Sequence, residues 1–190
     1  MTATLPAWMY PPRPTGWEAD DLDRIPELPR HTELIDGALI FMMSPQRSWH
    51  DRVIRRLTAA LEGQVPEGHT VEAQMTVRLS KTSRPEPDVL IANVPYDPDR
   101  TQFLPEQVLL LVEVVSDESM ERDRETKPFK YARAGIPHYW RVEDENGKPA
   151  IHSYELDDTT RFYVPTGVHR GTLTVTVPLT IEIDLPGLAR

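Results

Sequence analysis

The sequence of 190 residues contains no cysteine, which excludes disulfide bonds, zinc ribbons, iron–sulfur clusters and a thiol nucleophile. It also lacks any run of about 20 apolar residues, the length that a membrane-spanning helix needs. The first residues, Met1–Pro6, have neither the basic start nor the apolar stretch of a secretory signal peptide. We therefore expect a cytoplasmic protein without a membrane segment.

Basic residues are outnumbered, because 21 Lys and Arg stand against 30 Asp and Glu and leave a formal net charge of −9. This balance argues against non-specific coating of nucleic acid, which depends on neutralising phosphates with basic side chains. A local basic groove remains compatible with it, since binding follows the local field and not the sum of charges. The six histidines have no close ligand spacing, so the sequence predicts no zinc site.

Proline is abundant, with 19 residues, and six of them fall within the first 29 positions. Such spacing prevents a long helix and favours extended backbone. We expect a proline-rich N-terminal arm over residues 1–29, with a short helix between 17 and 25, followed by one folded domain over residues 30–190. The side chains expected to anchor the arm on the body are Trp8, Trp17 and Leu22.

The remaining sequence alternates between strand and helix patterns. Asp36-Gly37 predicts a tight turn between two strands over residues 33–42. Apolar residues at three- and four-residue steps predict a helix over 48–64. The other expected elements are strands over 70–79, 89–92 and 108–115, a helix over 127–134 that Thr126 caps and Gly135 ends, and strands over 138–142, 151–156, 161–164 and 172–177.

The almost continuous apolar run over 108–115 is typical of a strand that is covered on both faces. Together with the order of the other elements, it predicts an α/β fold. In this fold, helices flank a mixed β-sheet, and an antiparallel β extension follows.

Glu113 interrupts that apolar run. An ionised carboxylate inside a sheet is costly unless a cation or hydrogen bonds compensate it. Two interpretations fit equally well: a functional acid held in the interior, or an acid at the end of the strand that faces solvent or an arginine.

Two further charged residues fit a site around Glu113. Asp88 opens a short apolar strand one strand earlier, and two carboxylates from neighbouring strands offer the hard oxygen ligands that suit magnesium or manganese. Lys127 begins the next helix, where a cation can stabilise charge that develops on a phosphate. Taken singly, Asp88 also fits a loop acid and Lys127 an exposed lysine, so only the combination points to a site.

Pro87-Asp88 followed by Glu113 resembles the PD-(D/E)XK nuclease motif. Within that superfamily, the chain more closely resembles the Uma-two family of putative restriction endonucleases. The matching segments are spread over residues 30–190. They are Glu33–Leu39, Ser44-Pro45 with His50, Pro85–Leu90, Leu111–Ser116, Thr126–Val142 and Leu185–Leu188.

The resemblance implies a restriction-endonuclease-like mixed sheet flanked by helices, with Mg²⁺ or Mn²⁺ held by Asp88 and Glu113. The superfamily motif has its lysine two positions after the acid, where this sequence has Val115. Lys127 at the start of the next helix is the expected substitute, and Glu33 is expected as an additional acid near the site. The implied activity is that of a metal-dependent endonuclease that hydrolyses phosphodiester bonds of DNA.

Candidates for nucleic-acid contacts lie on the first long helix: Arg52, Arg55, Arg56 and His50. The arginines also fit a solvated helix face, and His50 also fits a helix cap. An alternative function is a catalytically inactive nuclease fold that binds nucleic acid or a protein partner, which the net negative charge favours. A glycosidase with paired carboxylates is a further alternative, and it needs a sugar-sized cleft. Edge strands lead us to expect a homodimer.

Overall fold

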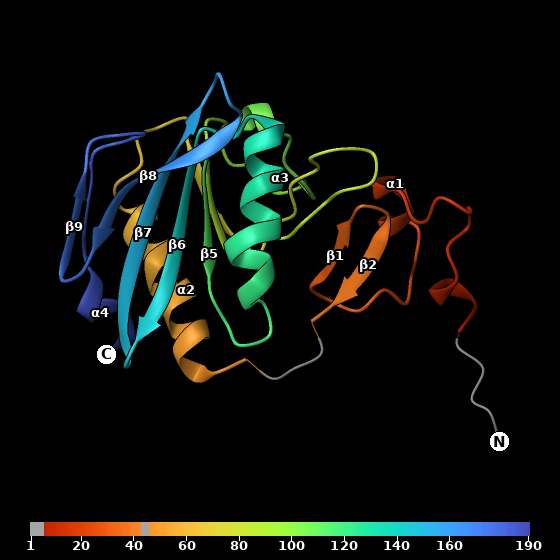
Figure 1. Cartoon of the computed structure of the whole chain (residues 1–190), viewed down its shortest axis with the longest axis horizontal. Coiled ribbons are helices and arrows are strands. Elements are labelled where there is room, and N and C mark those ends of the chain that lie inside the picture. The colour runs from red at the N-terminus through yellow and green to blue at the C-terminus, as the bar shows by residue number, and fades with distance from the viewer. Residues whose placement is uncertain (1–5, 43–45) are drawn as a thin grey trace.

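A mixed six-stranded β-sheet organises the chain, in the strand order β3-β4-β5-β6-β7-β8 (Figure 1). The structure is a computed structural model that describes residues 6–42 and 46–190. Strands β5 and β6 run parallel, and every other neighbouring pair is antiparallel. The strands are β3 (Thr70–Ala73), β4 (Val89–Ala92), β5 (Val108–Val114), β6 (His138–Glu145), β7 (Lys148–Asp157) and β8 (Phe162–His169).

Besides the six-stranded sheet, the described residues form two separate hairpins and several helices. The hairpins are β1 (Thr32–Ile35) with β2 (Ala38–Phe41), and β9 (Thr172–Val175) with β10 (Ile181–Asp184). The helices are α1 (Ala19–Leu22), α2 (Ser48–Glu62), α3 (Lys127–Ala134) and α4 (Leu185–Ala189). This arrangement confirms the predicted mixed sheet with flanking helices and an antiparallel extension. Among the described residues, no helix has the length and apolar character that crossing a membrane requires.

Helices α2 and α3 cover opposite faces of the sheet (Figure 1). Side chains alternate between the two faces along a strand, so Leu110, Val112 and Val114 of β5 pack in the α2 cluster, whereas Leu111 packs in the α3 cluster. The same alternation turns Glu113 toward α3, where it is only 1% exposed. Of the two interpretations of this acid, the structure therefore supports the buried one.

The N-terminal segment packs on the β1-β2 hairpin. Trp17 and Leu22 form a buried cluster with Leu34 of β1, and the Trp17 N–H donates a 2.8 Å hydrogen bond to the carbonyl of Gly37. Trp8 meets Phe41 edge to face. These contacts attach the segment to the strand that carries Glu33, while the proposed domain boundary at residues 29 and 30 stays a prediction.

The strand predicted over 70–79 is wrong in its second half, because β3 ends at Ala73. Gln74 adopts a left-handed backbone conformation with φ of +54°, which bends the chain out of the strand path. Val77 then forms an isolated bridge with Phe103 and packs in the α3 cluster. Alternating hydrophobicity does not reveal such a bend, since the buried residues keep their spacing of two.

The predicted cap at Thr126 is also wrong. A π-helical turn, Arg122–Thr126, runs directly into α3, so Thr126 has helical backbone angles and its side chain makes no capping bond. Gly135 ends the helix in the left-handed conformation, as predicted. Strand β10 and helix α4 are not among the predicted elements. Ser44-Pro45, one of the segments that resemble the Uma-two family, lies outside the described residues.

Replacing Trp17 with alanine is expected to lower the free energy of unfolding by about 3 kcal/mol, because the change empties the centre of a buried cluster. Urea unfolding followed by circular dichroism measures the change. Tyr10→Ala is the control, because this side chain in the same segment is 55% exposed and its loss is expected to cost within about 0.5 kcal/mol. Equally small effects for both variants would show that the segment is not part of the folded unit.

Candidate active site

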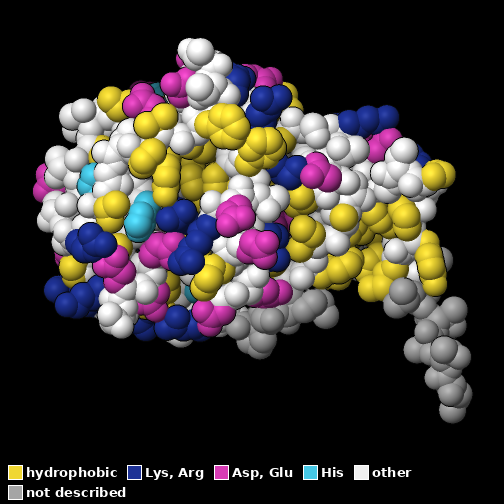
Figure 2. All heavy atoms as spheres, viewed as in Figure 1, with side chains coloured by type: hydrophobic (Ala, Val, Ile, Leu, Met, Phe, Trp, Pro, Cys, Tyr) yellow, Lys and Arg dark blue, Asp and Glu magenta, His cyan; other side chains and the backbone are white. Residues whose placement is uncertain are grey.

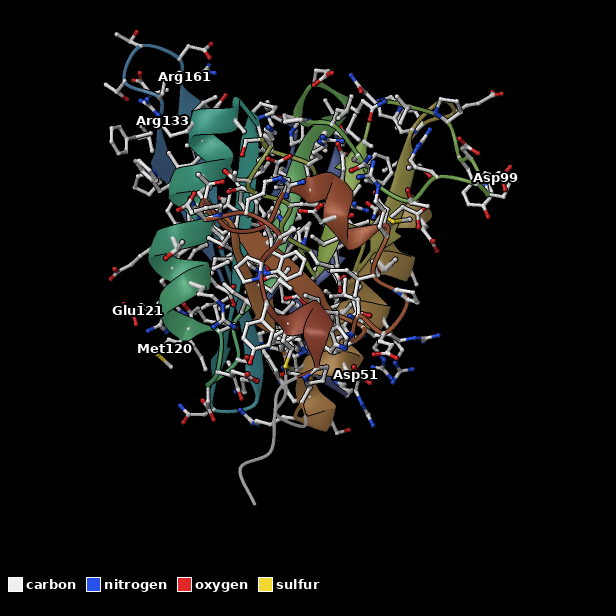
Figure 3. All side chains as sticks on the ribbon, turned by 90° about the vertical axis from the view of Figure 1, so that its right-hand side faces the viewer. Asp51, Asp99, Met120, Glu121, Arg133 and Arg161 are labelled. Carbon is white, nitrogen blue, oxygen red and sulfur yellow. The ribbon has the colours of Figure 1, made fainter. Side chains whose placement is uncertain are left out.

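The charged residues of the fold converge on a cavity of about 190 Å³ between β1, α2, β5 and the start of α3. Acids dominate its lining, and Lys127 is the one lysine or arginine among the described residues that line it. In Figure 3, Asp51 of α2 and Glu121, just before the π-helical turn, lie at the same end of the molecule, whereas Arg133 and Arg161 lie at the other end. The acidic side chains of the cavity are Glu33, Asp51, Glu86, Asp88, Glu113 and Asp123.

The ammonium group of Lys127 is the centre of this arrangement. Its Nζ lies 2.9 Å from Glu33 Oε1, 3.0 Å from Glu113 Oε2 and 3.5 Å from Asp123 Oδ1. Burial disfavours the charged form, but the attraction of Glu113, Glu33 and Asp123 outweighs it and holds the pKa of Lys127 well above its usual value. Lys127 is therefore a permanent cation at neutral pH and not a proton acceptor.

Glu113 is fixed by two donors. The Lys127 ammonium donates to Oε2, and the buried Tyr131 phenol of α3 donates to Oε1 at 2.6 Å. Burial raises the pKa of Glu113 well above its usual value, because the attraction of Lys127 does not offset burial and the neighbouring acids. The chain thus holds this carboxyl in one orientation although its charge is not fully compensated.

Asp88 reaches Glu113 through strand pairing. Val89 of β4 pairs with Val112 of β5, so one further step along the antiparallel register brings Asp88 beside Glu113. The backbone N–H of Val114 donates to Asp88 Oδ2 at 2.7 Å. This bond fixes one carboxylate oxygen of Asp88 at the end of β5.

His50 links α2 to the same strand end. Its Nε2 lies 2.8 Å from the carbonyl of Val114, to which it donates, and 3.6 Å from Asp88 Oδ2. Burial lowers the pKa of His50, but Asp88 and the Val114 carbonyl more than offset this effect, so the pKa is raised. The Nδ1 atom of His50 is buried and has no hydrogen-bond partner within the described parts of the chain.

The β1-β2 hairpin brings Glu33 to the cavity. Glu33 Oε1 accepts a 2.9 Å hydrogen bond from the backbone N–H of Glu86 in addition to the Lys127 contact. Glu33 Oε2 is buried and has no partner in residues 6–42 and 46–190. Glu86 in turn faces His31, with 2.5 Å between Oε1 and Nδ1. Burial is the main cause of the raised pKa of Glu86.

The structure brings most of the predicted site residues together. Asp88, Glu113, Lys127, Glu33 and His50 all line the cavity. The three arginines that were predicted to contact nucleic acid, Arg52, Arg55 and Arg56, do not line the cavity. Arg52 and Arg56 instead donate to backbone carbonyls of the C-terminal segment, at Arg190 and Gly187, and Arg55 is exposed.

The site residues predicted from the sequence do not include Asp123, Glu86 and His31, which line the cavity, or Tyr131, which donates to Glu113. The spacing of residues 123, 127 and 131 could have indicated that Asp123 and Tyr131 lie near Lys127, because residues four apart share a helix face. The other residues gave no signal, since their place depends on how the hairpin and the Pro85–Pro87 loop meet.

A divalent ion fits the chemistry of this cavity. Among the described residues, no group of three or more His, Asp or Glu side chains is arranged to hold a metal ion. Mg²⁺ commonly uses only one or two carboxylates and completes its shell with water and substrate phosphate. Asp88 and Glu113 would supply such a pair, and Glu33 Oε2, which has no hydrogen-bond partner among the described residues, is a further carboxylate oxygen in the cavity.

Comparison with known proteins gives two findings. The model of the Uma2 (Uma-two) family, described as putative restriction endonuclease, matches residues 19–187. The chain is also similar to the crystal structure of a putative nuclease belonging to DUF820 from Anabaena variabilis, with a TM-score of 0.66 and 15% identity over 90% of this chain and 98% of that chain. This likeness confirms the predicted nuclease-like fold. None of the curated proteins compared with the sequence matches it.

The Asp123 carboxyl should make stability depend on pH. Burial, together with repulsion from Asp88 and Glu33, outweighs the attraction of Lys127 and raises the pKa of Asp123 to about 6. The folded state therefore binds this proton more tightly than the unfolded chain, and the resulting stabilisation, present at about pH 4, is lost as the pH rises through about 6. Asp123→Asn keeps a neutral side chain, so it is expected to match the wild type at pH 4 and exceed its unfolding free energy by about 2–3 kcal/mol at pH 8.

Urea unfolding of both proteins at the two pH values measures this difference. Glu125→Gln is the matched control, because Glu125 is exposed on the same π-helical turn. A variant of Asp123 that is less stable than the wild type at pH 8 would contradict the argument, since it would mean that the attraction of Lys127 exceeds the cost of burial.

Proposed function

We propose, from the premise that the chain belongs to the Uma2 family of putative restriction endonucleases, that it is a metal-dependent endonuclease hydrolysing phosphodiester bonds of DNA. The observation that carries this proposal is the meeting of Asp88, Glu113 and Lys127 in one cavity. Asp88 immediately precedes β4, Glu113 lies on β5 and Lys127 begins α3, and Glu113 and Lys127 are held by direct contact. The geometry supports hydrolysis of a charged ester better than simple binding, because the cavity gathers more carboxylates than its single lysine compensates.

The acid-rich lining explains why a metal is needed. A phosphodiester carries a negative charge, and the carboxylates of Glu33, Glu86, Asp88, Glu113 and Asp123 would repel it. Asp88 and Glu113 would hold a Mg²⁺ or Mn²⁺ ion, and the bound ion supplies polarisation of the phosphate and a lower pKa of a bound water. Entry of the substrate into this cavity is therefore coupled to the presence of a divalent cation.

The side chains of the chain itself position and stabilise charge. Lys127 offers a fixed ammonium whose raised pKa keeps it protonated, so it stabilises negative charge on the phosphate and leaves the activation of water to other groups. Tyr131 orients Glu113, and the Val114 N–H orients Asp88. His50 lines the same cavity, so a phosphate bound there would lie near its imidazole ring.

The surface around α3, whose first residue Lys127 lines the cavity, carries both signs of charge. Figure 2 shows acidic and basic side chains intermingled on the face that carries α3. Non-specific phosphate contacts on this face are therefore expected to be few, and affinity should depend on the cation in the cavity. The homodimer also stays a prediction, which molar mass from size-exclusion chromatography with light scattering checks.

Glu113→Gln is expected to lower metal-dependent cleavage of plasmid DNA by roughly 100-fold or more, because it removes a charge that both holds the metal and faces Lys127. Cleavage is measured by gel with Mg²⁺ and with Mn²⁺. The matched control is Glu72→Gln on β3, which lies outside the cavity lining and should cleave as the wild type does. Robust cleavage by the Glu113 variant, after removal of contaminating nuclease, would falsify the proposal.

Divalent cations are expected to stabilise the protein by about 2.7 kcal/mol at a concentration of 100 times the dissociation constant, because only the folded state joins Asp88 to Glu113. Thermal unfolding with and without millimolar Mn²⁺ or Mg²⁺ measures the effect. Asp88→Asn should remove it, whereas Asp99→Asn should retain it, since Asp99 is exposed on a loop far from the cavity (Figure 3). A shift that persists in the Asp88 variant contradicts the assigned metal position.

A further inference from the structure

The π-helical turn that immediately precedes α3 places the carboxyl of Asp123 in the cavity lining. Within it, the N–H of Lys127 donates to the carbonyl of Arg122, five residues earlier, in place of the four-residue step of an α-helix. Asp123 lies in this turn and is 1% exposed. Its carboxyl lines the cavity and lies 3.5 Å from the Lys127 ammonium.

The backbone of Asp123 is held at both of its polar groups. Its N–H donates to the carbonyl of Ser119 at 2.9 Å, and its carbonyl accepts a 2.6 Å hydrogen bond from the buried Tyr139 phenol of β6. Ser119 is itself tied to Ser116 by reciprocal bonds between side chains and backbone N–H groups. The sheet and the loop after β5 therefore fix where the carboxyl of Asp123 points.

The buried carboxyl of Asp123 contributes little to the stability of the fold. Its Oδ1 is buried without a hydrogen-bond partner among the residues that the structure describes, and two other carboxylates, Glu33 and Glu113, already lie closer to the Lys127 ammonium. Burying a third carboxylate beside one cation is costly. A chain that holds such a group rigidly, through Tyr139 and Ser119, keeps it for what it does in the cavity.

We propose that Asp123 is a positioning residue, which holds the Lys127 ammonium in place beside the Glu113 and Asp88 carboxylates through the geometry of the π-helical turn. Glu33 contacts the ammonium from the hairpin and Glu113 contacts it from the sheet. Asp123 adds the contact from the ammonium's own helical segment, four residues earlier. Without it, Lys127 is free to move toward the hairpin, and the distance between its ammonium and the reacting phosphate is no longer fixed. This inference rests on the proposed nuclease function.

The test compares Asp123→Asn with Glu125→Gln, a change of the same chemistry at an exposed position of the same turn. At saturating Mg²⁺, Asp123→Asn is expected to lower kcat roughly 10- to 100-fold with little change in KM for DNA, because the bound substrate faces a misplaced cation. The control should cleave as the wild type does. Equal kcat for both variants would overturn the proposal.

A second readout does not depend on activity. In protein labelled with ¹³Cε-lysine, the Lys127 signal is assigned by its loss in Lys127→Met. It is expected to shift in Asp123→Asn and to stay in place in Glu125→Gln. A signal that does not move in Asp123→Asn overturns the proposal even if cleavage falls, since Asp123 would then act without Lys127. If the wild type cleaves no DNA, the nuclease proposal fails, and this signal alone decides the role of Asp123.

Tyr139→Phe provides an independent variant that leaves every cavity side chain in place. It removes the hydroxyl that holds the Asp123 carbonyl. We expect a smaller fall in kcat, of a few-fold, and a shift of the Lys127 signal in the same direction as in Asp123→Asn. An unmoved signal with wild-type kcat would show that the π-helical turn does not position the ammonium.

Discussion

The structure depends on one buried cation shared by three carboxylates. The Lys127 ammonium joins Glu33 of the β1-β2 hairpin, Glu113 of the central strand β5 and Asp123 of the turn before α3. Because these contacts come from three separate parts of the chain, the ammonium determines how the hairpin and α3 are set against the sheet at the cavity. Removing it would leave the carboxylates buried and uncompensated, which is among the most destabilising changes in a protein interior.

The cavity contains more carboxylates than cations, and other interactions in the fold must offset the free-energy cost of burying them. Burial raises the pKa values of Glu113, Asp123 and Glu86, so each of these groups disfavours the folded state when it is ionised. Two apolar clusters, one on each face of the sheet, offset that cost. An excess of buried acid is what a binding site for a divalent cation requires, and it is not what stability alone would select.

Sequence reasoning reached the residues whose signals are local. Glu113 stood out because an acid interrupts an apolar strand, and Lys127 because it begins the next helix. Asp123 was hidden in a charged stretch, since nothing in that stretch shows that a π-helical turn will bury it. The bend at Gln74 could not be predicted for a related reason, because a left-handed residue leaves the alternation of buried side chains intact. The bonds of Arg52 and Arg56 to the C-terminal segment are contacts across more than 130 residues of sequence, which periodicity cannot reveal.

By itself, the sequence determined most of the strands and the two long helices, because hydrophobic periodicity and turn residues act over a few positions. It thereby set Glu113 on a covered strand and Lys127 at the start of α3. Only the tertiary structure decided that the hairpin brings Glu33 to this point, that Asp88 lies beside the end of β5, and that Tyr131 and Tyr139 orient the acids. These contacts join residues far apart in the chain, and their geometry follows from packing of whole elements and not from any local preference.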